Sequence, residues 1–250
     1  MRGVMAVSLQ SMQHDMKRVD TLAANLANTL TSAYKRELVI ERPFVNLIER
    51  GTSPSNLPAE LAETLRVVAD NRVGTLKSTG QSFDLAIGGT GFFQVQTKEG
   101  LAYTRQGNFH LDARGRLVAA QGDPVLGKSG EIFLKTSTPS IDELGNIRDP
   151  NGNSTQRDQV LAQVKVVEFA DSASLEKMGD GLFMANEHAT FSDAIAPQLK
   201  QAHLENSNVN SMDEMVQLMQ TMRHFEAMQK MTQGYDEMLS TAIRKLGDLS

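Results

Sequence analysis

Residues 211–239 read SMDEMVQLMQTMRHFEAMQKMTQGYDEML, and they hold seven of the thirteen methionines in the chain. Apolar side chains recur at steps of three and four residues, which is the spacing of an amphipathic helix. Ser211 followed by Glu214 has the form of a capping box, in which each side chain satisfies the other residue's backbone N–H. The pattern predicts a long helix that begins near Ser211 and is about 50 Å long. Its expected apolar seam is Met215, Leu218, Met222, Phe225, Met228, Met231, Tyr235, Met238, Ala242 and Leu246.

The N-terminal thirty residues have the same kind of period, which predicts a helix from about Val4 to Asn28. Since both ends carry heptad seams, we expect the two helices to pair as a coiled coil. One domain would then be discontinuous in sequence. The expected N-terminal seam is Met5, Leu9, Met12, Met16, Val19, Ala23, Leu26 and Leu30.

The middle of the chain has the period-two alternation that is typical of strands. In residues 82–97 it predicts strand, turn, strand, with a hairpin turn at the glycines of IGGTGFF. Short strands are also expected within 101–127 and over 159–169, whereas 138–158 has the composition of turns and loop. Residues 59–68, AELAETLRVV, fit either a short helix or an extended arm.

The predicted fold class is therefore α+β, with long N- and C-terminal helices pairing as a coiled coil and with a β-rich middle domain. Four parts are expected. Residues 1–31 and 201–250 form an inner helical domain, residues 32–75 form a linker or arm, and residues 76–200 form the β-rich outer domain.

Composition excludes several classes of protein. The 250 residues allow one large domain or two modest ones. A formal net charge of −5, with no basic stripe, argues against a nucleic-acid binder. The absence of cysteine excludes disulfides and a cysteine nucleophile. We expect neither a cleaved signal peptide nor a membrane-spanning segment, because the longest apolar run near the start is VMAV, residues 4–7.

No motif for chemistry is complete. The glycines at 88, 89 and 91 are followed by strand rather than by a helix N-terminus, which disfavours a phosphate loop. Residues 149–160 resemble a calcium loop in their alternating Asp and Asn, but Val160 stands where the bidentate glutamate belongs. The histidines lack metal-ligand spacing, and the methionine spacing follows packing rather than copper capture. We therefore expect no enzyme activity, no cofactor and no metal.

Three stretches resemble bacterial flagellar rod and hook proteins. LAANLANTLTSAYKRE, residues 22–37, resembles their N-terminal signature, an Asn-Leu-Ala-Asn core followed by a turn and an aromatic-Lys/Arg pair. Residues 84–127 resemble the central block, and LENSNVNSMDEMVQLMQTMRHFEAMQKM, residues 204–231, resembles the C-terminal signature. The length suits the rod proteins of the FlgF (proximal) or FlgG (distal) type, and both types stay open.

The resemblance implies a structural subunit that stacks helically into the flagellar rod, the axial drive shaft that transmits torque. Implied partners are further copies of itself, other rod or hook proteins and the flagellar type III export apparatus, and the implied location is the basal body, in the periplasmic rod. One departure concerns the linker: family members usually have glycine where this chain has Ala33, before Tyr34. Because alanine resists positive φ angles, we expect a different turn here.

Terminal helices with unpartnered apolar faces are expected to be mobile in the monomer and to fold on docking. The expected assembly residues lie on the two seams and in the two asparagine-rich signatures. They are Met5, Leu9, Met12, Met16, Val19, Asn25, Leu26, Asn28, Ser207, Asn208, Val209, Asn210, Met215, Leu218, Met219, Met222, Phe225, Met228, Met231, Tyr235 and Met238.

Two rival functions remain at this stage. A generic coiled-coil adaptor or scaffold with a β-domain predicts closed dimers or trimers, while a rod subunit predicts linear polymers. A small-molecule enzyme would need a perturbed acidic or histidine cluster in the β-domain.

Overall fold

A computed structural model describes residues 2–41, 65–151, 159–170, 175–186 and 189–247. The described chain divides into two compact units. The helical unit comprises the described parts of Met1–Ala27, Glu37–Asp70 and Val209–Ser250. The β unit comprises Asn28–Arg36 and the described parts of Asn71–Asn208. Each unit is therefore built from segments that lie far apart in the sequence.

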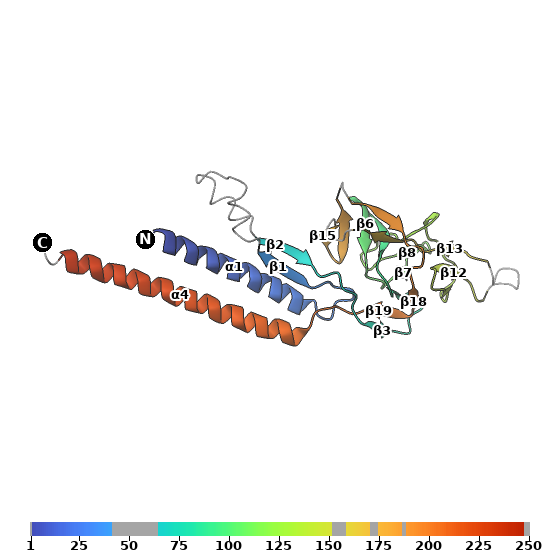
Figure 1. Cartoon of the computed structure of the whole chain (residues 1–250). Helices are drawn as coiled ribbons and strands as arrows, with labels where there is room; N and C mark the ends of the chain where they lie inside the picture. The colour runs from blue at the N-terminus through green and yellow to red at the C-terminus, as the bar shows by residue number, and fades with distance from the viewer. Residues whose placement is uncertain (1, 42–64, 152–158, 171–174, 187–188, 248–250) are drawn as a thin grey trace. The chain divides into compact units, whose positions relative to one another are not determined.

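The helical unit contains the two helices found among the described residues. They are α1, Arg2–Ala27, and α4, Ser211–Gly247, so both predicted terminal helices are confirmed. A two-stranded antiparallel sheet, β1 (Glu37–Glu41) with β2 (Leu65–Ala69), packs beside α1. The two helices lie side by side and antiparallel (Figure 1). Residues 65–68 are thus extended, while residues 59–64 lie outside the described part of the chain.

The predicted coiled coil between the helices is wrong. A coiled coil inserts apolar side chains of one helix between those of the other, but none of the described seam side chains is buried. The helices instead meet through polar groups: Asn25 Nδ2 donates to Glu214 Oε2 at 3.1 Å, and His224 Nδ1 lies 2.6 Å from Asp15 Oδ2. Among the described side chains of the two helices, the buried ones are Ser8, Asp15, Thr21, Leu22, Asn25, Glu214 and Thr221.

A groove of about 730 Å³ between α1 and α4 has the same polar character. Its lining carries amide, hydroxyl and charged groups, which bind water as well as they bind one another. The side chains that line this groove thus add polar groups, not an apolar seam, between the helices. The lining residues are Gln10, Ser11, His14, Asp15, Arg18, Gln217, Gln220, Thr221 and His224.

The start of α4 is confirmed at Ser211, but its cap differs from the predicted capping box. Asn210 is the N-cap residue, because its Oδ1 accepts the backbone N–H of Met212 at 3.1 Å. Its Nδ2 donates to Asp213 Oδ2 at 2.8 Å. The polar pair at the start of α4 is thus Asn210 with Asp213 instead of Ser211 with Glu214, and the Glu214 carboxylate accepts from Asn25 Nδ2.

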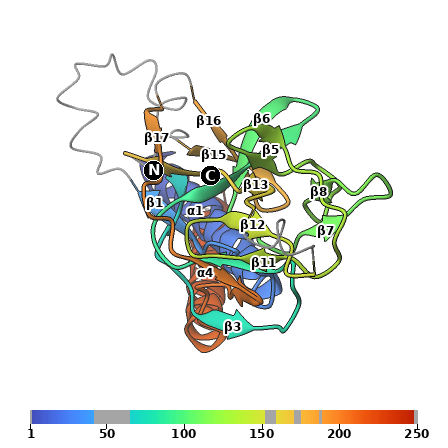
Figure 2. The same ribbon diagram turned by 90° about the vertical axis from the view of Figure 1, so that its right-hand side faces the viewer.

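The β unit contains a six-stranded antiparallel sheet with the order β15-β16-β6-β5-β14-β17 and several two- or three-stranded sheets. Figure 2 shows β5 and β6 side by side in the larger sheet, and β7 and β8 as a separate pair. The strands are β3 Leu76–Ser78, β4 Leu85–Ile87, β5 Phe92–Thr97, β6 Gly100–Thr104, β7 His110–Leu111, β8 Leu117–Val118, β9 Leu126–Gly127, β10 Gly130–Glu131, β11 Ser140–Ile141, β12 Asn146–Arg148, β13 Ala162–Gln163, β14 Val166–Phe169, β15 Leu175–Gly179, β16 Leu182–Ala185, β17 Phe191–Asp193, β18 Leu199–Gln201 and β19 His203–Glu205.

The predicted strands on either side of the glycine segment, residues 88–91, exist, but the predicted hairpin is wrong. β4 pairs with β18, and β5 pairs with β6 and β14, so the glycine segment connects two different sheets. Gly91 has a φ of 135°, and a Cβ there would lie 2.9 Å from Val166 Cγ1. The range 138–158, expected as loop, also contains the short strands β11 and β12.

Alternation along β5 builds the core on both faces of the larger sheet, because successive side chains point to opposite faces. Phe93 and Val95 are fully buried in the main apolar core. There the Phe93 ring packs edge to face with the Phe109 ring, with 5.0 Å between the ring centroids. Phe92 points the other way and packs with Tyr103 and other aromatic and aliphatic side chains. The β unit thus has its own apolar core.

Replacing Phe93 by alanine should reduce the free energy of unfolding of the β unit by about 3–5 kcal/mol, because it leaves a cavity in a fully buried site. Urea unfolding followed by circular dichroism measures the change. Phe133, which is 59% exposed, is the matched control, and its alanine variant should change stability by about 0.5 kcal/mol or less. Equal losses in the two variants would contradict this account of the core.

Candidate functional site

In the helical unit, Asn25 joins three elements through one side chain. Its Nδ2 donates to the Glu37 carbonyl at 2.9 Å, and its Oδ1 accepts the Glu37 N–H at 2.8 Å. The amide thus pairs with the Glu37 peptide as a neighbouring strand would. The same Nδ2 also reaches Glu214 on α4, and the Asn25 side chain is fully buried. Asn25 therefore sets the positions of α1, β1 and α4 relative to one another.

In the β unit, the carboxylate of Glu205 lies at the centre of a buried ionic cluster. Lys35 Nζ is 2.6 Å from Oε1, and Arg105 Nε is 2.8 Å from Oε2. The Gly74 N–H donates to Oε1 at 2.7 Å. The side chains of Lys35, Arg105 and Glu205 are 1%, 3% and 0% exposed. We call Lys35, Gly74, Arg105 and Glu205 the Glu205 cluster.

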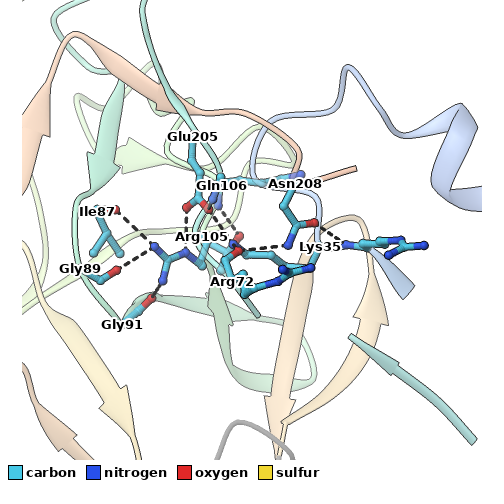
Figure 3. Close-up of polar contacts among 12 residues, drawn as sticks. Lys35, Arg72, Ile87, Gly89, Gly91, Arg105, Gln106, Glu205 and Asn208 are labelled. Atoms are coloured by element: carbon cyan, nitrogen blue, oxygen red, sulfur yellow. Dashed lines mark hydrogen bonds and ion pairs between the residues drawn. The ribbon is translucent and has the colours of Figure 1, made fainter. Parts of the chain in front are cut away.

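Arg105 extends the cluster to the glycine segment between β4 and β5. Figure 3 shows its guanidinium between the Glu205 carboxylate and three backbone carbonyl oxygens. Those of Gly89 and Gly91 each accept at 2.9 Å, and that of Ile87 at 3.3 Å. The segment therefore presents carbonyl groups to a cation, whereas a phosphate loop presents N–H groups to an anion. Its glycines bring the backbone close to Arg105.

Asn208 attaches the segment before β1 to the β unit by a second set of bonds. Its Oδ1 accepts the Arg36 N–H at 2.7 Å, and its own N–H donates to the Tyr34 carbonyl at 3.3 Å. The Asn208 Nδ2 donates to the Arg72 carbonyl at 3.0 Å. The same carbonyl also accepts from Lys35 Nζ at 2.8 Å. Three segments distant in sequence are therefore joined at one place.

The turn before Lys35 has a residue in the left-handed conformation, and that residue is Ala33. Ala33 has a φ of 55°, so the expectation of a different turn is wrong at this position. The side chain is buried, and the Ala33 N–H donates to the Glu205 carbonyl at 2.8 Å. A left-handed conformation costs an alanine roughly 1–2 kcal/mol. The surrounding hydrogen bonds hold the turn in that conformation.

The charges in the cluster determine the protonation of Glu205. Burial acts to raise the pKa of its carboxyl group. The charges of Arg105 and Lys35 and the hydrogen bonds from Lys35 and Gly74 outweigh that effect, so the pKa is lowered from its ordinary value of 4.5. The Glu205 carboxyl is therefore an anion at neutral pH, balanced by two cations.

The asparagine-rich signatures lie in polar contacts. In the β unit, Asn28 Oδ1 accepts from Thr31 Oγ1 at 3.1 Å, and Ser207 is half-buried. In the helical unit Val209 is buried and Asn210 caps α4. The structure thus gives Asn25, Asn208 and Asn210 distinct hydrogen-bonding roles.

The seam residues lie at the surface of the helical unit. On α1, Leu9 and Met16 are exposed, while Met12, Val19 and Leu26 are half-buried; the side chain of Met5 lies outside the described residues. On α4, the exposed seam residues are Met215, Met222, Met231 and Met238, and the half-buried ones are Leu218, Phe225, Met228 and Tyr235; Met219, an expected assembly residue beside the seam, is also exposed.

The sequence did not single out Arg105 and Glu205. Lys35 was noted only as part of the aromatic-Lys/Arg pair of the N-terminal signature, and Glu214 only as a member of the expected capping box. Across the described residues, no three His, Asp or Glu side chains come together as a metal site requires. Most of the calcium-like loop, residues 152–158, lies outside the described chain.

Comparison with known proteins finds two matching family models and several similar chains. Residues 86–181 match the model of the flagellar hook protein FlgE/F/G D1 domain, and residues 200–245 match that of the flagellar basal body rod FlgEFG protein C-terminal region. The chain is 32% identical over 240 residues to the flagellar basal-body rod protein FlgG of Buchnera aphidicola from Acyrthosiphon pisum, which covers 88% of this chain and 91% of the relative. The chain belongs to the flagellar basal-body rod protein family.

The similar members of the family include proteins of both the FlgG and the FlgF type. The FlgG of Bacillus subtilis is 30% identical over 256 residues, covering 94% of this chain and 96% of its own length. The FlgF of Caulobacter vibrioides is 28% identical over 250 residues, covering the whole of both chains. The chain is thus a structural rod subunit of the flagellar basal body, which assembles with other rod or hook components. Neither described helix is long and apolar enough to cross a membrane.

Glu205 should make the stability of the β unit depend on pH. Because its pKa is lower in the folded chain, its contribution is present above pH 4.5 and is lost as the pH falls through the lower folded value. At neutral pH, Glu205→Gln should cost roughly 3–5 kcal/mol in the free energy of unfolding, since it removes the buried negative charge that faces Lys35 and Arg105. Urea unfolding at several pH values from about 3 to 7 measures the free energy of unfolding of the wild type and of Glu205→Gln.

The pH dependence has its own control. Asp112 and Asp142 also have lowered pKa values. The backbone N–H of Arg116 is the main cause for Asp112, and at Asp142 the hydrogen bonds from Asn146 and Leu144 and the charge of Arg148 outweigh burial, so both proteins should lose some stability in acid. The difference in free energy of unfolding between the wild type and Glu205→Gln should become smaller below pH 4.5. If this difference does not change with pH, the ionised carboxylate of Glu205 does not stabilise the β unit.

Ala33 should tolerate glycine and reject a β-branched residue. Ala33→Gly relieves the left-handed strain but loses a buried methyl group and makes the unfolded chain more flexible, so the net change should be within about 1 kcal/mol. Ala33→Val should destabilise the β unit by about 2 kcal/mol or more, because valine is a strong outlier at positive φ. Thermal unfolding of the two variants checks the order, and a valine variant as stable as the glycine one would refute it.

Proposed function

We propose that this rod subunit polymerises helically into the axial drive shaft, which transmits torque for motility. The observation that carries the proposal is the row of exposed methionines on α4. Met215, Met219 and Met222 are 49%, 55% and 44% exposed, and Met231 and Met238 are 60% and 66% exposed. Met215, Met219 and Met222 recur at steps of four and three residues and so share one face of α4, and an exposed apolar stripe of this kind on a folded chain indicates a protein interface.

The polar contact between α1 and α4 supports the same proposal. Polar contacts through Asn25 with Glu214 and Asp15 with His224 join the helices, while Met215, Met219 and Met222 stay exposed for contacts with neighbouring subunits. Heterologous contacts that do not close into a ring produce open helical polymers. Methionine is unbranched and fits irregular gaps, which suits a surface that meets copies of itself and unlike rod proteins.

We propose a matching arrangement for the assembled subunit. The helical ends, residues 1–31 and 201–250, contribute to the inner tube, the β-rich part, residues 76–200, faces outward, and residues 32–75 connect them. The assembly surface comprises the seam and signature residues given above. The subunit reaches the rod through the flagellar type III export apparatus and binds no nucleic acid, which agrees with its net charge of −5. Its role is structural and non-enzymatic.

A strain that lacks this chain should be non-motile and should assemble no hook. Complementation with a variant in which Met215, Met219 and Met222 are all glutamine should fail to restore swimming, because the stripe loses its apolar contacts with neighbours. Soft-agar swimming and electron microscopy of basal bodies measure both results. The purified variant should keep its circular dichroism spectrum, since these side chains are already exposed in the chain.

The matched control changes three exposed polar residues of the same helix: Arg223→Gln, Glu226→Gln and Glu237→Gln. This variant should restore swimming. Normal flagella in the deletion strain would overturn the proposed function. Normal swimming with the methionine variant would show instead that the α4 stripe is not the assembly surface.

A further inference from the structure

The chain passes between its two units four times, after residues 27, 36, 70 and 208. The β unit therefore receives its covalent connections through three short stretches. They are the whole of 28–36, which has a crossing at each end, the residues from 71 onward, and the residues that end at 208.

All three stretches are bonded to the Glu205 cluster. Lys35 comes from the first stretch and Gly74 from the second, and Glu205 itself lies near the end of the third. Backbone hydrogen bonds connect the same stretches: Ala33 N–H to the Glu205 carbonyl at 2.8 Å, and Asn206 N–H to the Thr75 carbonyl at 2.8 Å. The cluster therefore attaches every connection between the units to one buried carboxylate.

Arg105 joins this carboxylate to the sheet. It follows β6 directly, and its guanidinium binds the carbonyls of Gly89 and Gly91, which lead into β5. It also lies over the Phe92 ring, 5.8 Å from the ring centroid. The cluster is thus connected to the two central strands of the six-stranded sheet.

We infer that the Glu205 cluster is the mechanical anchor of the β unit, a set of positioning residues that fixes all four chain crossings to the sheet. Apolar contacts can slide with little change in energy, whereas charge-assisted hydrogen bonds require particular distances and directions. A force that reaches the β unit along any of the three stretches is then passed to β5 and β6 through Glu205 and Arg105. The mechanical part of this inference rests on the proposed role in torque transmission.

Lys35→Met in the full-length chain tests the anchor, because it removes the ion pair from the first stretch and leaves the Arg105–Glu205 pair in place. Hydrogen exchange with mass spectrometry should show exchange in residues 28–36 at least about tenfold faster than in the wild type. Peptides from β5 and β6 should keep wild-type protection. Lys35→Arg, which keeps the charge and the donors, should restore most of the protection.

Lys165→Met is the matched control, since it removes a partly exposed pair with Asp193 at 3.6 Å elsewhere in the β unit. It should leave exchange in residues 28–36 unchanged. If Lys35→Met does not fold, Lys35→Gln, which keeps one donor for Glu205, is measured in its place. Unchanged exchange in residues 28–36 would overturn the inference, and so would equally faster exchange in β5 and β6, because the cluster would then hold the whole unit rather than the crossings.

In cells, the Lys35→Met variant should assemble rods and hooks but swim more slowly than the wild type as the viscosity of the medium is raised. Wild-type swimming at every viscosity would overturn the mechanical part of the inference. A deletion strain with normal flagella would overturn the proposed function instead, and the exchange result would still stand by itself.

Discussion

One buried carboxylate organises the β unit of this rod protein. Glu205 has almost no contact with water, so its charge is tolerated only because Lys35 and Arg105 lie within 2.8 Å of its oxygens. Each of these three residues needs the other two, and they come from parts of the chain separated by tens of residues. The turn at Ala33, the approach of the glycine segment and the course of the chain at Gly74 are all arranged so that the cluster is complete.

Two asparagines join distant segments through hydrogen bonds to the backbone, as Glu205 joins them through its charge. Asn25 and Asn208 each use the oxygen and the nitrogen of one amide to bind main-chain groups of another segment. Aspartate has no donor and leucine has neither group, so no common replacement of similar size forms both bonds. This accounts for their places in the Asn-Leu-Ala-Asn and Ser-Asn-Val-Asn stretches, which a reading of the helix period alone would treat as capping or solvated residues.

The sequence predicted both helices and the strands around residues 85–97, but it missed short strands such as β11 and β12 and did not predict which elements pair. Both helices follow from the period of their apolar residues, and the strands around residues 85–97 follow from alternation. The predicted coiled coil was wrong because an apolar heptad pattern indicates that a helix face is buried by a partner but does not identify the partner. In this chain the two helices contact each other through polar positions, among them Asp15 and Glu214. The hairpin was wrong because β4 pairs with β18, more than a hundred residues later. No local pattern contains such a pairing, and the same holds for the Glu205 cluster.

The exposed methionines of α4 give the unassembled chain a chemical weakness. A thioether that water can reach is open to oxidation, and the sulfoxide that results is polar and chiral. Oxidation at Met215 or Met219 would turn an adaptable apolar contact into one that favours water. If the stripe is covered in the finished rod, subunits that wait for assembly are sensitive to oxidants, while those already incorporated are shielded by their neighbours.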